Sequence, residues 1–468
     1  MVQKIVSAGQ PGRKANVEEK RYGLLPSGLT VEHLSLHKRL REPNKILPDR
    51  LPDKYPDKLP IRNSESLHEL RYQMTSWMSA APFAPNEKSC TEEGLLDLAS
   101  ILNRKAAQVA GQLEPETADT LRRHMAVINS YYSNLIEGNR TLPHQIREAQ
   151  RGNFEDDPVA RDKQIESLAH IDVQAWIASE DRSLEEVISV DFIKELHRRF
   201  YRDLPGDLKK VELDETGEVA WVEGGKFRDR GVKVGRHIPP DAEHLEQLMT
   251  QFCNEYKSVR HQGDRRLIAI AAAHQRFLWI HPFLDGNGRV VRLWTDAAFR
   301  AAGLESVGVW CLSRGLAIYS EKYKSNLAQA DAVQQGQTDG RGPLSELGLA
   351  RFCHFVLDTS VDQVSYISEL LNLKSMKRRI EDFVASRDDL KPASTWVLYQ
   401  AFIQGSISRS DALTLTGERD ERTARRLLKK LRDLGLLVDA DPKDSRSPLL
   451  WSVPEHAEPV YFPNLSPQ

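Results

Sequence analysis

The fold turns on residues 267–292, which read LIAIAAAHQRFLWIHPFLDGNGRVVR. The first part is apolar on almost every side, which predicts a helix buried in the middle of a domain. Pro282 lacks an N–H and cannot continue that helix, so the chain must turn at His281. Apolar periodicity resumes after Gly288 and predicts a second helix that ends at Gly303. The polar loop is therefore the N-terminus of a helix and follows directly on a core helix.

The backbone and the arginines of this loop suit a phosphate. A helix N-terminus exposes unpaired amides and the positive end of the helix dipole, and both attract anions. Gly286 and Gly288 flank Asn287 and let the backbone approach a ligand closely. Arg289 and Arg292 are one helical turn apart, so both guanidiniums can bind one anion from the same side. These residues together predict a nucleotide-binding site.

Two further side chains beside the arginines point to chemistry as well as binding. Asp285 offers a hard oxygen ligand for Mg²⁺. His281 is the nearby side chain that can accept a proton near neutral pH. Taken singly, such residues are typical of turns, caps and solvated helix faces. As one ordered set they indicate attack of a hydroxyl on a nucleotide phosphate, and the sequence contains no Walker-type glycine loop that would compete with this site.

Residues 281–292 resemble the signature of the Fic family, HPF-x-[DE]-GNGR-x-x-R, with every defined position filled. The resemblance implies a mainly α-helical Fic-type bundle and a protein adenylyltransferase that moves AMP from ATP to a Ser, Thr or Tyr hydroxyl. It implies His281 as the base, Asp285 as the Mg²⁺ ligand and the cradle that follows as the ATP site. The same pocket could instead remove AMP, or do both. A few family members move other groups, such as phosphocholine, and the signature does not separate these reactions.

A predicted helix at residues 117–138 carries a second resemblance. Glu137 falls in its last turn, beside the negative end of the helix dipole, where a carboxylate is unfavourable unless a cation compensates it. Ser133, Glu137 and Gly138 fit the [ST]-x-x-x-E-[GN] inhibitory motif of many Fic proteins. The resemblance implies that Glu137 pairs with Arg292 and obstructs the γ-phosphate position. A solvent-facing glutamate is the alternative.

Residues 224–240, GGKFRDRGVKVGRHIPP, alternate in a way that predicts a β-hairpin and loop. The segment resembles the Fic flap, which holds a target segment by strand addition. An ordinary surface hairpin is the alternative. The residues expected to line the flap are Gly225, Arg228, Val234, Gly235 and His237.

The segment after Gly303 also resembles the family, where a Ser-Arg-Gly turn and the next helix border the nucleotide base. We therefore expect Tyr319 and Tyr323 near the adenine, although aromatic residues four apart on a helix are typical of a core. Other stretches with helical periodicity are residues 94–112, 145–178, 190–201, 241–256 and 344–373.

The last eighty residues or so change character. Helices are predicted at 394–404, 409–415 and 420–434, followed by two strands around the turn DPKDSRSP, an order that resembles a winged helix-turn-helix. The third helix is basic, and the residues that could contact DNA are Arg422, Arg425, Arg426 and Lys429. Acidic residues surround it, and winged helices also bind proteins, so DNA and protein partners both stay open.

The predicted organisation has four parts. They are an extended or disordered segment at 1–62, a Fic domain at 63–375, a winged helix-turn-helix domain at 390–455 and a tail at 456–468.

Composition limits the function classes. The chain has 468 residues and a formal net charge of −2, which argues against wholesale coating of nucleic acid. It has no secretory signal, no apolar run near the ~20 residues of a membrane span, and scattered cysteines without zinc spacing. We expect a cytoplasmic enzyme, unless a specialised secretion system exports it. Its expected partners are ATP and a protein substrate, which could be the chain itself, and a homodimer is allowed.

A different class of function fits part of the same evidence. The chain could be a DNA-binding regulator whose pocket senses a nucleotide. The resemblance to a winged helix favours this reading, whereas an intact His281 argues against it, because a sensor needs phosphate ligands but no base.

Overall fold

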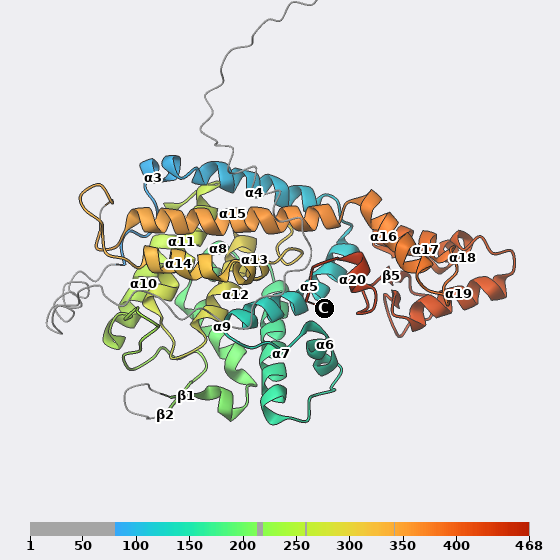
Figure 1. Ribbon diagram of the computed structural model, residues 1–468, viewed down its shortest axis with the longest axis horizontal. Helices are drawn as coiled ribbons and strands as arrows, with labels where there is room; N and C mark the ends of the chain where they lie inside the picture. Colours follow the sequence, from blue (N-terminus) through green and yellow to red (C-terminus); the bar gives the residue numbers. More distant parts are fainter. Residues whose placement is uncertain (1–79, 213–218, 258–259, 341, 468) are drawn as a thin grey trace, which may run out of the picture. The chain divides into compact units, whose positions relative to one another are not determined.

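The computed structural model describes residues 80–212, 219–257, 260–340 and 342–467. By its contacts the chain divides into two units, 1–63 and 64–468, and every described residue lies in the second. The segment predicted to be extended at 1–62 lies outside the described residues. The described part is mainly α-helical, as predicted (Figure 1). None of its helices is both long enough and apolar enough to cross a membrane.

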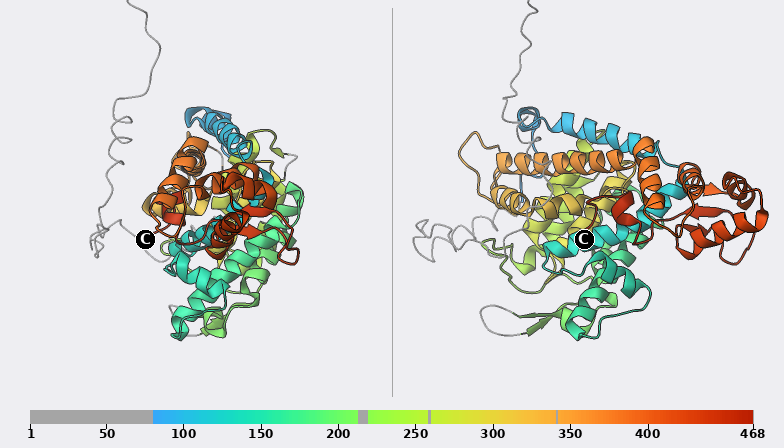
Figure 2. Two further views of the ribbon diagram at one scale, coloured as in Figure 1. Left: turned by 90° about the vertical axis from the view of Figure 1, so that its right-hand side faces the viewer. Right: turned by 45° about the vertical axis from the view of Figure 1, so that its right-hand side comes forward.

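The predicted core helix is α11 (Arg265–Ile280). Its small side chains allow close packing on all sides, and Ala271, Ala272 and Ala273 have no exposed surface. Helices α4, α10, α12 and α15 pack against α11, and α4 and α15 run side by side over one face of the bundle (Figures 1 and 2). These four helices are α4 (Leu95–Ala110), α10 (Leu245–Tyr256), α12 (Asn287–Ala301) and α15 (Glu346–Leu370).

A second group of helices packs on the far side of α12. Helix α5 (Pro115–Ile136) contacts α7 and α13, while α12 contacts α7, α8 and α9. This packing brings the C-terminal end of α5 to the first turns of α12. The other members are α6 (Pro143–Gln150), α7 (Pro158–Ala178), α8 (Leu184–Val187), α9 (Val190–Arg202) and α13 (Leu312–Ile318).

The single helix predicted at 145–178 is wrong, because α6 and α7 are separate. Gly152 takes a left-handed conformation (φ 89°) that ends the first helix. Pro158 begins the second, and the Asp157 side chain caps it by accepting a hydrogen bond from the amide of Ala160 (2.9 Å). A proline at the first helical position marks a start that apolar periodicity alone does not show.

The hairpin predicted within 224–240 is also wrong. That segment contains one isolated bridge, between Val234 and His237, and no strand. The antiparallel hairpin lies earlier, where β1 (Lys210–Glu212) pairs with β2 (Val219–Trp221). The segment begins with Gly224 and Gly225 and ends with Pro239 and Pro240, and both residue types disfavour the hydrogen-bonded ladder of a β-sheet.

The predicted Ser-Arg-Gly turn is a further correction, since Ser313, Arg314 and Gly315 lie inside α13. The remaining elements of this part are α3 (Glu87–Glu92), the 3₁₀ turns η1 (Gly206–Lys209) and η2 (Ala242–His244), α14 (Ser320–Ala330) and α16 (Leu373–Ala385). Helix α16 had not been predicted.

The three helices and two strands predicted at the C-terminus form in the predicted order, and a short strand that had not been predicted lies between the first two helices. They are α17 (Ser394–Gln404), β3 (Ser406–Ile407), α18 (Arg409–Leu415), α19 (Glu421–Asp433), β4 (Leu437–Asp439) and β5 (Leu449–Trp451). The strands form one antiparallel sheet in the order β3-β5-β4. Their assignment to a winged helix-turn-helix stays a prediction.

The segment predicted as a tail is folded onto α5 and its neighbours. Glu458 begins α20 (Glu458–Tyr461), is buried, and pairs with Arg147. The backbone oxygen of Leu465 accepts a hydrogen bond from the Tyr132 hydroxyl (3.2 Å). Buried aromatic and aliphatic side chains therefore hold residues 458–465 in place.

Candidate active site

The loop between α11 and α12 is fixed by its own residues. His281 ends α11 in a left-handed conformation (φ 50°), which turns the chain toward Pro282. The Asn287 side chain accepts a hydrogen bond from the amide of Phe283 (3.0 Å) and donates one to its carbonyl (2.8 Å). Asn287 therefore shapes the loop with its side chain, and only its backbone amide is left for a phosphate. Gly286 is also left-handed (φ 81°), and a Cβ there would lie 2.8 Å from the Tyr201 ring.

Arg292 binds the predicted inhibitory residues. Its Nε donates to Ser133 Oγ and its Nη2 to the Ser133 carbonyl, both at 2.9 Å. Nη2 also donates to Glu137 Oε1 at 2.7 Å. Gly138, with φ 90°, turns the chain away after Glu137. The predicted contact between Glu137 and Arg292 is thus present, and a charge-assisted bond of this kind is among the stronger ones in proteins.

The Glu137 carboxylate lies on the first turn of α12, where an anion would bind. A Cβ built on Gly288 would overlap Glu137 Oε1. Although burial raises the pKa of Glu137, the guanidiniums of Arg292 and Arg289 outweigh it and hold that pKa below its ordinary value. Glu137 is therefore ionised at neutral pH and lies against the first turn of α12.

Arg289 is held by a carboxylate that the sequence analysis missed. Glu166 of α7 forms a buried ion pair with Arg289, and its other oxygen accepts a hydrogen bond from Asn139 (2.8 Å). The Arg289 guanidinium also lies 5.1 Å from the centre of the Phe200 ring and 3.2 Å from Asp285 Oδ2. Its pKa falls to about 10 through burial, so Arg289 stays positively charged at neutral pH.

Asp285, the predicted metal ligand, is oriented by α9. Tyr201 donates its hydroxyl proton to Asp285 Oδ2 at 2.6 Å, and His197 Nε2 lies 3.1 Å from the Asp285 backbone oxygen. The Asp285 side chain is 43% exposed, so it is open to a ligand. A metal ligand is commonly oriented by such partners. Tyr201 and His197 were not predicted, because nothing in the spacing of α9 distinguishes them from core residues.

His281 is set up to accept a proton. Burial, and then the nearby Arg228 guanidinium, lower its pKa to about 4, so the imidazole is neutral at pH 7. Arg228 holds the loop through two hydrogen bonds. Its Nε donates to the His281 carbonyl (2.8 Å) and its Nη2 to the Pro240 carbonyl (2.6 Å). Its guanidinium is buried in these bonds, so the expectation that it lines a docking flap is corrected.

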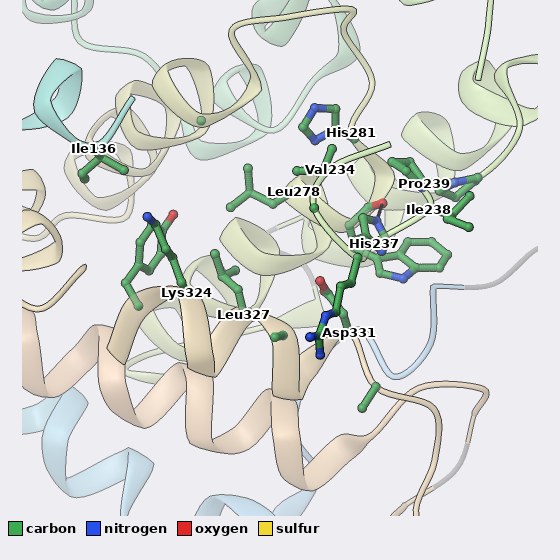
Figure 3. A pocket seen from close by; sticks show the side chains of 18 of the residues that line it. Ile136, Val234, His237, Ile238, Pro239, Leu278, His281, Lys324, Leu327 and Asp331 are labelled. Carbon is green, nitrogen blue, oxygen red and sulfur yellow. Dashed lines mark hydrogen bonds between the residues drawn. The ribbon is translucent and has the colours of Figure 1, made fainter. Parts of the chain in front are cut away.

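One cavity of about 870 Å³ is lined by part of the predicted site, whereas Asp285, Gly286, Asn287 and Arg289 are not among its lining residues (Figure 3). His281, Glu137, Gly288 and Arg292 line it at one end, and its lining is otherwise mostly apolar. Side chains from the end of α11, from α14 and from the flap face the same space in Figure 3. Labelled examples are Leu278, Lys324, Leu327, Asp331 and Ile238.

Three of the five predicted flap residues line this cavity. They are Val234, Gly235 and His237. The Val234–His237 bridge closes a tight turn, and His237 Nε2 lies 2.8 Å from the Trp279 carbonyl, which ties the turn to α11. Gly225 lies elsewhere, against α9, where a Cβ would come 2.9 Å from the Lys194 carbonyl. Its place in the flap is therefore corrected to a packing role.

The two predicted tyrosines separate. Tyr323 lines the cavity and its hydroxyl lies 2.7 Å from His274 Nε2. Tyr319 does not line it, because it sits at the junction of α13 and α14 beside Lys322. Tyr319 caps α14 and Tyr323 lies one turn into it, so the two rings have different surroundings; their place near the adenine stays a prediction.

The donor set around Asp285 fits Mg²⁺ bound together with phosphates. Among the described residues there is no group of three or more His, Cys, Asp or Glu side chains that could hold a metal. Mg²⁺ commonly takes one or two carboxylates, and substrate phosphates and water complete its shell. Asp285, a hard carboxylate beside an anion cradle, matches that pattern.

These features define a class of site: a neutral histidine and a metal-compatible carboxylate in the loop that leads into a helix N-terminus suited to anions. Residues 187–298 match the model of the Fic/DOC family. The signature loop lies inside the matched residues.

Curated relatives share this region. The chain is 34% identical over 179 residues to "Protein adenylyltransferase Fic" of Drosophila persimilis, covering 38% of this chain and 32% of the relative. The same-named protein of Drosophila ananassae is 32% identical over 199 residues, covering 41% and 36%. The chain thus spans about a third of the length of the curated relatives it matches.

Solved structures of similar proteins include a Fic family protein from Desulfovibrio desulfuricans G20. It aligns with a TM-score of 0.46 at 18% identity, over 77% of this chain and 96% of that one. Fic-1 from C. elegans, residues 134–508, aligns with a TM-score of 0.44 at 18% identity, over 65% and 84%.

Proposed function

We propose that this chain is a protein adenylyltransferase that moves AMP from ATP to a Ser, Thr or Tyr hydroxyl of a protein. The observation that carries the proposal is the shared cavity of His281, Gly288 and Arg292, a neutral base in one space with an anion cradle. The names of the curated relatives support the same reaction.

The reaction needs a base, neutralised charge and orientation. The target hydroxyl oxygen attacks the α-phosphorus, its proton passes to His281, and the bond to the β-phosphate breaks as pyrophosphate leaves. The first amides of α12 face the developing negative charge, while Arg289 and Arg292 neutralise the outgoing phosphates. Mg²⁺, when bound to Asp285, would supply further neutralisation of the phosphates. Tyr201 and Arg289 hold Asp285 in position for that role.

Glu137 is the inhibitory residue in this proposal. Its carboxylate neutralises Arg292 and overlaps the space above Gly288, so ATP must displace it to bind productively. Ser133 supports the inhibited arrangement by holding the rest of the Arg292 guanidinium.

One observation also favours removal of AMP from a modified protein. Glu137 is ionised and lines the same cavity as His281, so it could orient a water for attack on the α-phosphorus. Both reactions use one pocket, and the chain could catalyse either direction.

The test compares label from α-³²P-ATP and γ-³²P-ATP, added with Mg²⁺ to the purified protein and to a cell lysate. We expect protein-bound label from the α position alone in wild type and its absence in His281→Ala. Glu137→Gly should increase it. Label from the γ position would show a kinase and overturn the proposal. Loss of label from a pre-modified protein, dependent on Glu137, would instead support AMP removal.

A further inference from the structure

Helix α19 has a sharply divided surface that the proposed reaction does not use. Ala424, Leu427, Leu428 and Leu431 are buried against the C-terminal sheet and α18. The opposite side is exposed and basic. Arg422, Arg426 and Lys429, which we term the basic stripe, follow one another at spacings of four and three residues and so share one face of the helix.

The acidic residues near α19 do not neutralise this stripe. Between residues 405 and 453 the sequence has ten basic and eight acidic side chains, so placement decides the local charge. Asp420 caps the helix by accepting hydrogen bonds from the Thr423 amide (3.0 Å) and hydroxyl (2.7 Å). Glu421 pairs with Arg425 at 2.6 Å. No carboxylate of the described residues forms an ion pair with the basic stripe, although Asp433 stands at its C-terminal end.

In the loop between β4 and β5, residues 440–448, the acidic side chains again bind nearby backbone groups while the basic side chains are exposed. Asp441 accepts a hydrogen bond from the Lys443 amide and Asp444 one from the Arg446 amide, each at 2.8 Å. The acidic side chains thus hold the turn, whereas the Lys443 and Arg446 side chains are exposed.

One aspartate joins this loop to the helices. Asp439, at the end of β4, forms ion pairs with Arg432 of α19 and Arg409 of α18. The Arg409 Nε also donates to the Ser447 carbonyl (3.1 Å) at the other end of the loop. Helices α18 and α19, both labelled in Figure 1, contact each other. The basic stripe and the loop are therefore parts of one connected unit.

We propose that the basic stripe and the 440–448 loop bind the phosphate backbone of double-stranded nucleic acid. An α-helix fits the major groove. Exposed, unpaired Lys and Arg side chains can replace the counterions that surround the phosphates, and the release of those counterions favours binding. A helix packed against a preceding helix, with a basic loop beside it, is an arrangement that DNA-binding domains use. This site is separate from the cavity and does not depend on the proposed transferase activity.

The test measures binding of the full chain to a labelled duplex of about 30 base pairs by fluorescence anisotropy, across salt concentrations from about 50 to 200 mM. We compare wild type with Arg422→Ala/Arg426→Ala/Lys429→Ala. Alanine favours helix and these side chains are exposed, so the fold should persist, which circular dichroism checks. The control Lys88→Ala/Arg104→Ala/Arg351→Ala removes three exposed cations from α3, α4 and α15.

We expect wild type and the control to bind with the same steep salt dependence. Because each lost phosphate contact changes the slope of log K against log salt by roughly 0.9, the stripe variant should have a slope shallower by about 2 to 3 and bind at least roughly tenfold more weakly at low salt. Equal affinity of the stripe variant and wild type would overturn the proposal, as would an equal loss in the control. Tighter binding to an acidic polypeptide than to the duplex would also overturn it, in favour of a protein partner.

Discussion

Replacing Glu137 by glycine should separate the inhibitory contact from the rest of the site. The change removes the 2.7 Å bond from Arg292 and clears the space above Gly288. Both Ser133 bonds to Arg292 remain, so the guanidinium keeps its place. Glu137 is the C-cap of α5, so glycine there does not interrupt the helix. The expected gain therefore reflects the loss of one carboxylate.

The magnitude follows from the strength of that bond. A hydrogen bond to a charged group contributes about 1.5–3 kcal/mol. Since about 1.4 kcal/mol corresponds to a factor of ten, wild type would hold its ATP-competent arrangement about 10- to 150-fold less often than the variant. The apparent affinity for ATP should rise by that factor in Glu137→Gly, with the increase in AMP incorporation largest at low ATP.

The assay is incorporation of α-³²P label against ATP concentration. Glu93→Gly is a matched control, because Glu93 is also an acidic C-cap (φ −91°, ψ 2°, against φ −90°, ψ 5° for Glu137) and is also followed by a left-handed glycine. The control should behave as wild type. If Glu137→Gly and wild type agreed within about twofold at every ATP concentration, the contact would contribute too little to be inhibitory, against the range expected for such bonds.

Three further predictions concern metal binding, folding and pH. Tyr201→Phe removes the hydroxyl that orients Asp285 and should raise the Mg²⁺ concentration for half-maximal AMP transfer about tenfold or more. The control Tyr461→Phe should leave it unchanged, because the buried Tyr461 hydroxyl has no partner among the described residues. An unchanged Mg²⁺ curve in Tyr201→Phe would argue against the metal assignment. Glu458→Ala leaves Arg147, whose side chain is 12% exposed, without its carboxylate and should lower the free energy of unfolding by about 3–5 kcal/mol in urea titrations. A loss below about 1 kcal/mol would mean that the C-terminal segment is weakly held. Burial lowers the pKa values of five histidines to about 3 or 4, namely His124, His170, His197, His274 and His281. The unfolded chain therefore takes up more protons once the pH falls below about 6.5, and the free energy of unfolding should drop by up to about 1.4 kcal/mol per pH unit for each histidine between about pH 6.5 and 4. Equal urea midpoints at pH 7 and 5 would contradict this.

The signature loop was predictable because its constraints are local. Pro282 stops one helix, Gly286 needs a left-handed conformation, and the residues between them can be placed from spacing alone. The same holds for most helices, whose apolar periodicity reports the buried face. Apolar periodicity does not report the boundary between α6 and α7, which Gly152 and Pro158 mark instead.

The flap failed for a different reason. Alternation through Val232 and Val234 predicts strands, but a strand needs a partner with a free edge. Instead, the Arg228 guanidinium donates hydrogen bonds to the carbonyls of Arg230 and Pro240 in this segment and to the carbonyl of His281. A buried arginine that satisfies several carbonyls replaces the ladder. Sequence spacing does not reveal such a clamp, since an arginine in a polar stretch normally faces water.

Glu137 and Glu166 show where inference from sequence ends. Both carboxylates pair with signature arginines over more than a hundred residues of separation, Glu137 with Arg292 and Glu166 with Arg289. Glu137 could be singled out because a carboxylate at a helix C-terminus is electrostatically unfavourable and so calls for a cation. Glu166 lies in the middle of α7, where no such local cost exists and a glutamate is an ordinary helix former. A charged residue whose partner is distant in the sequence can be recognised from the sequence only when its position in the local secondary structure is electrostatically unfavourable. Both arginines of the cradle are therefore paired with carboxylates in the folded chain, and in the proposed reaction ATP must displace Glu137 from Arg292 to bind.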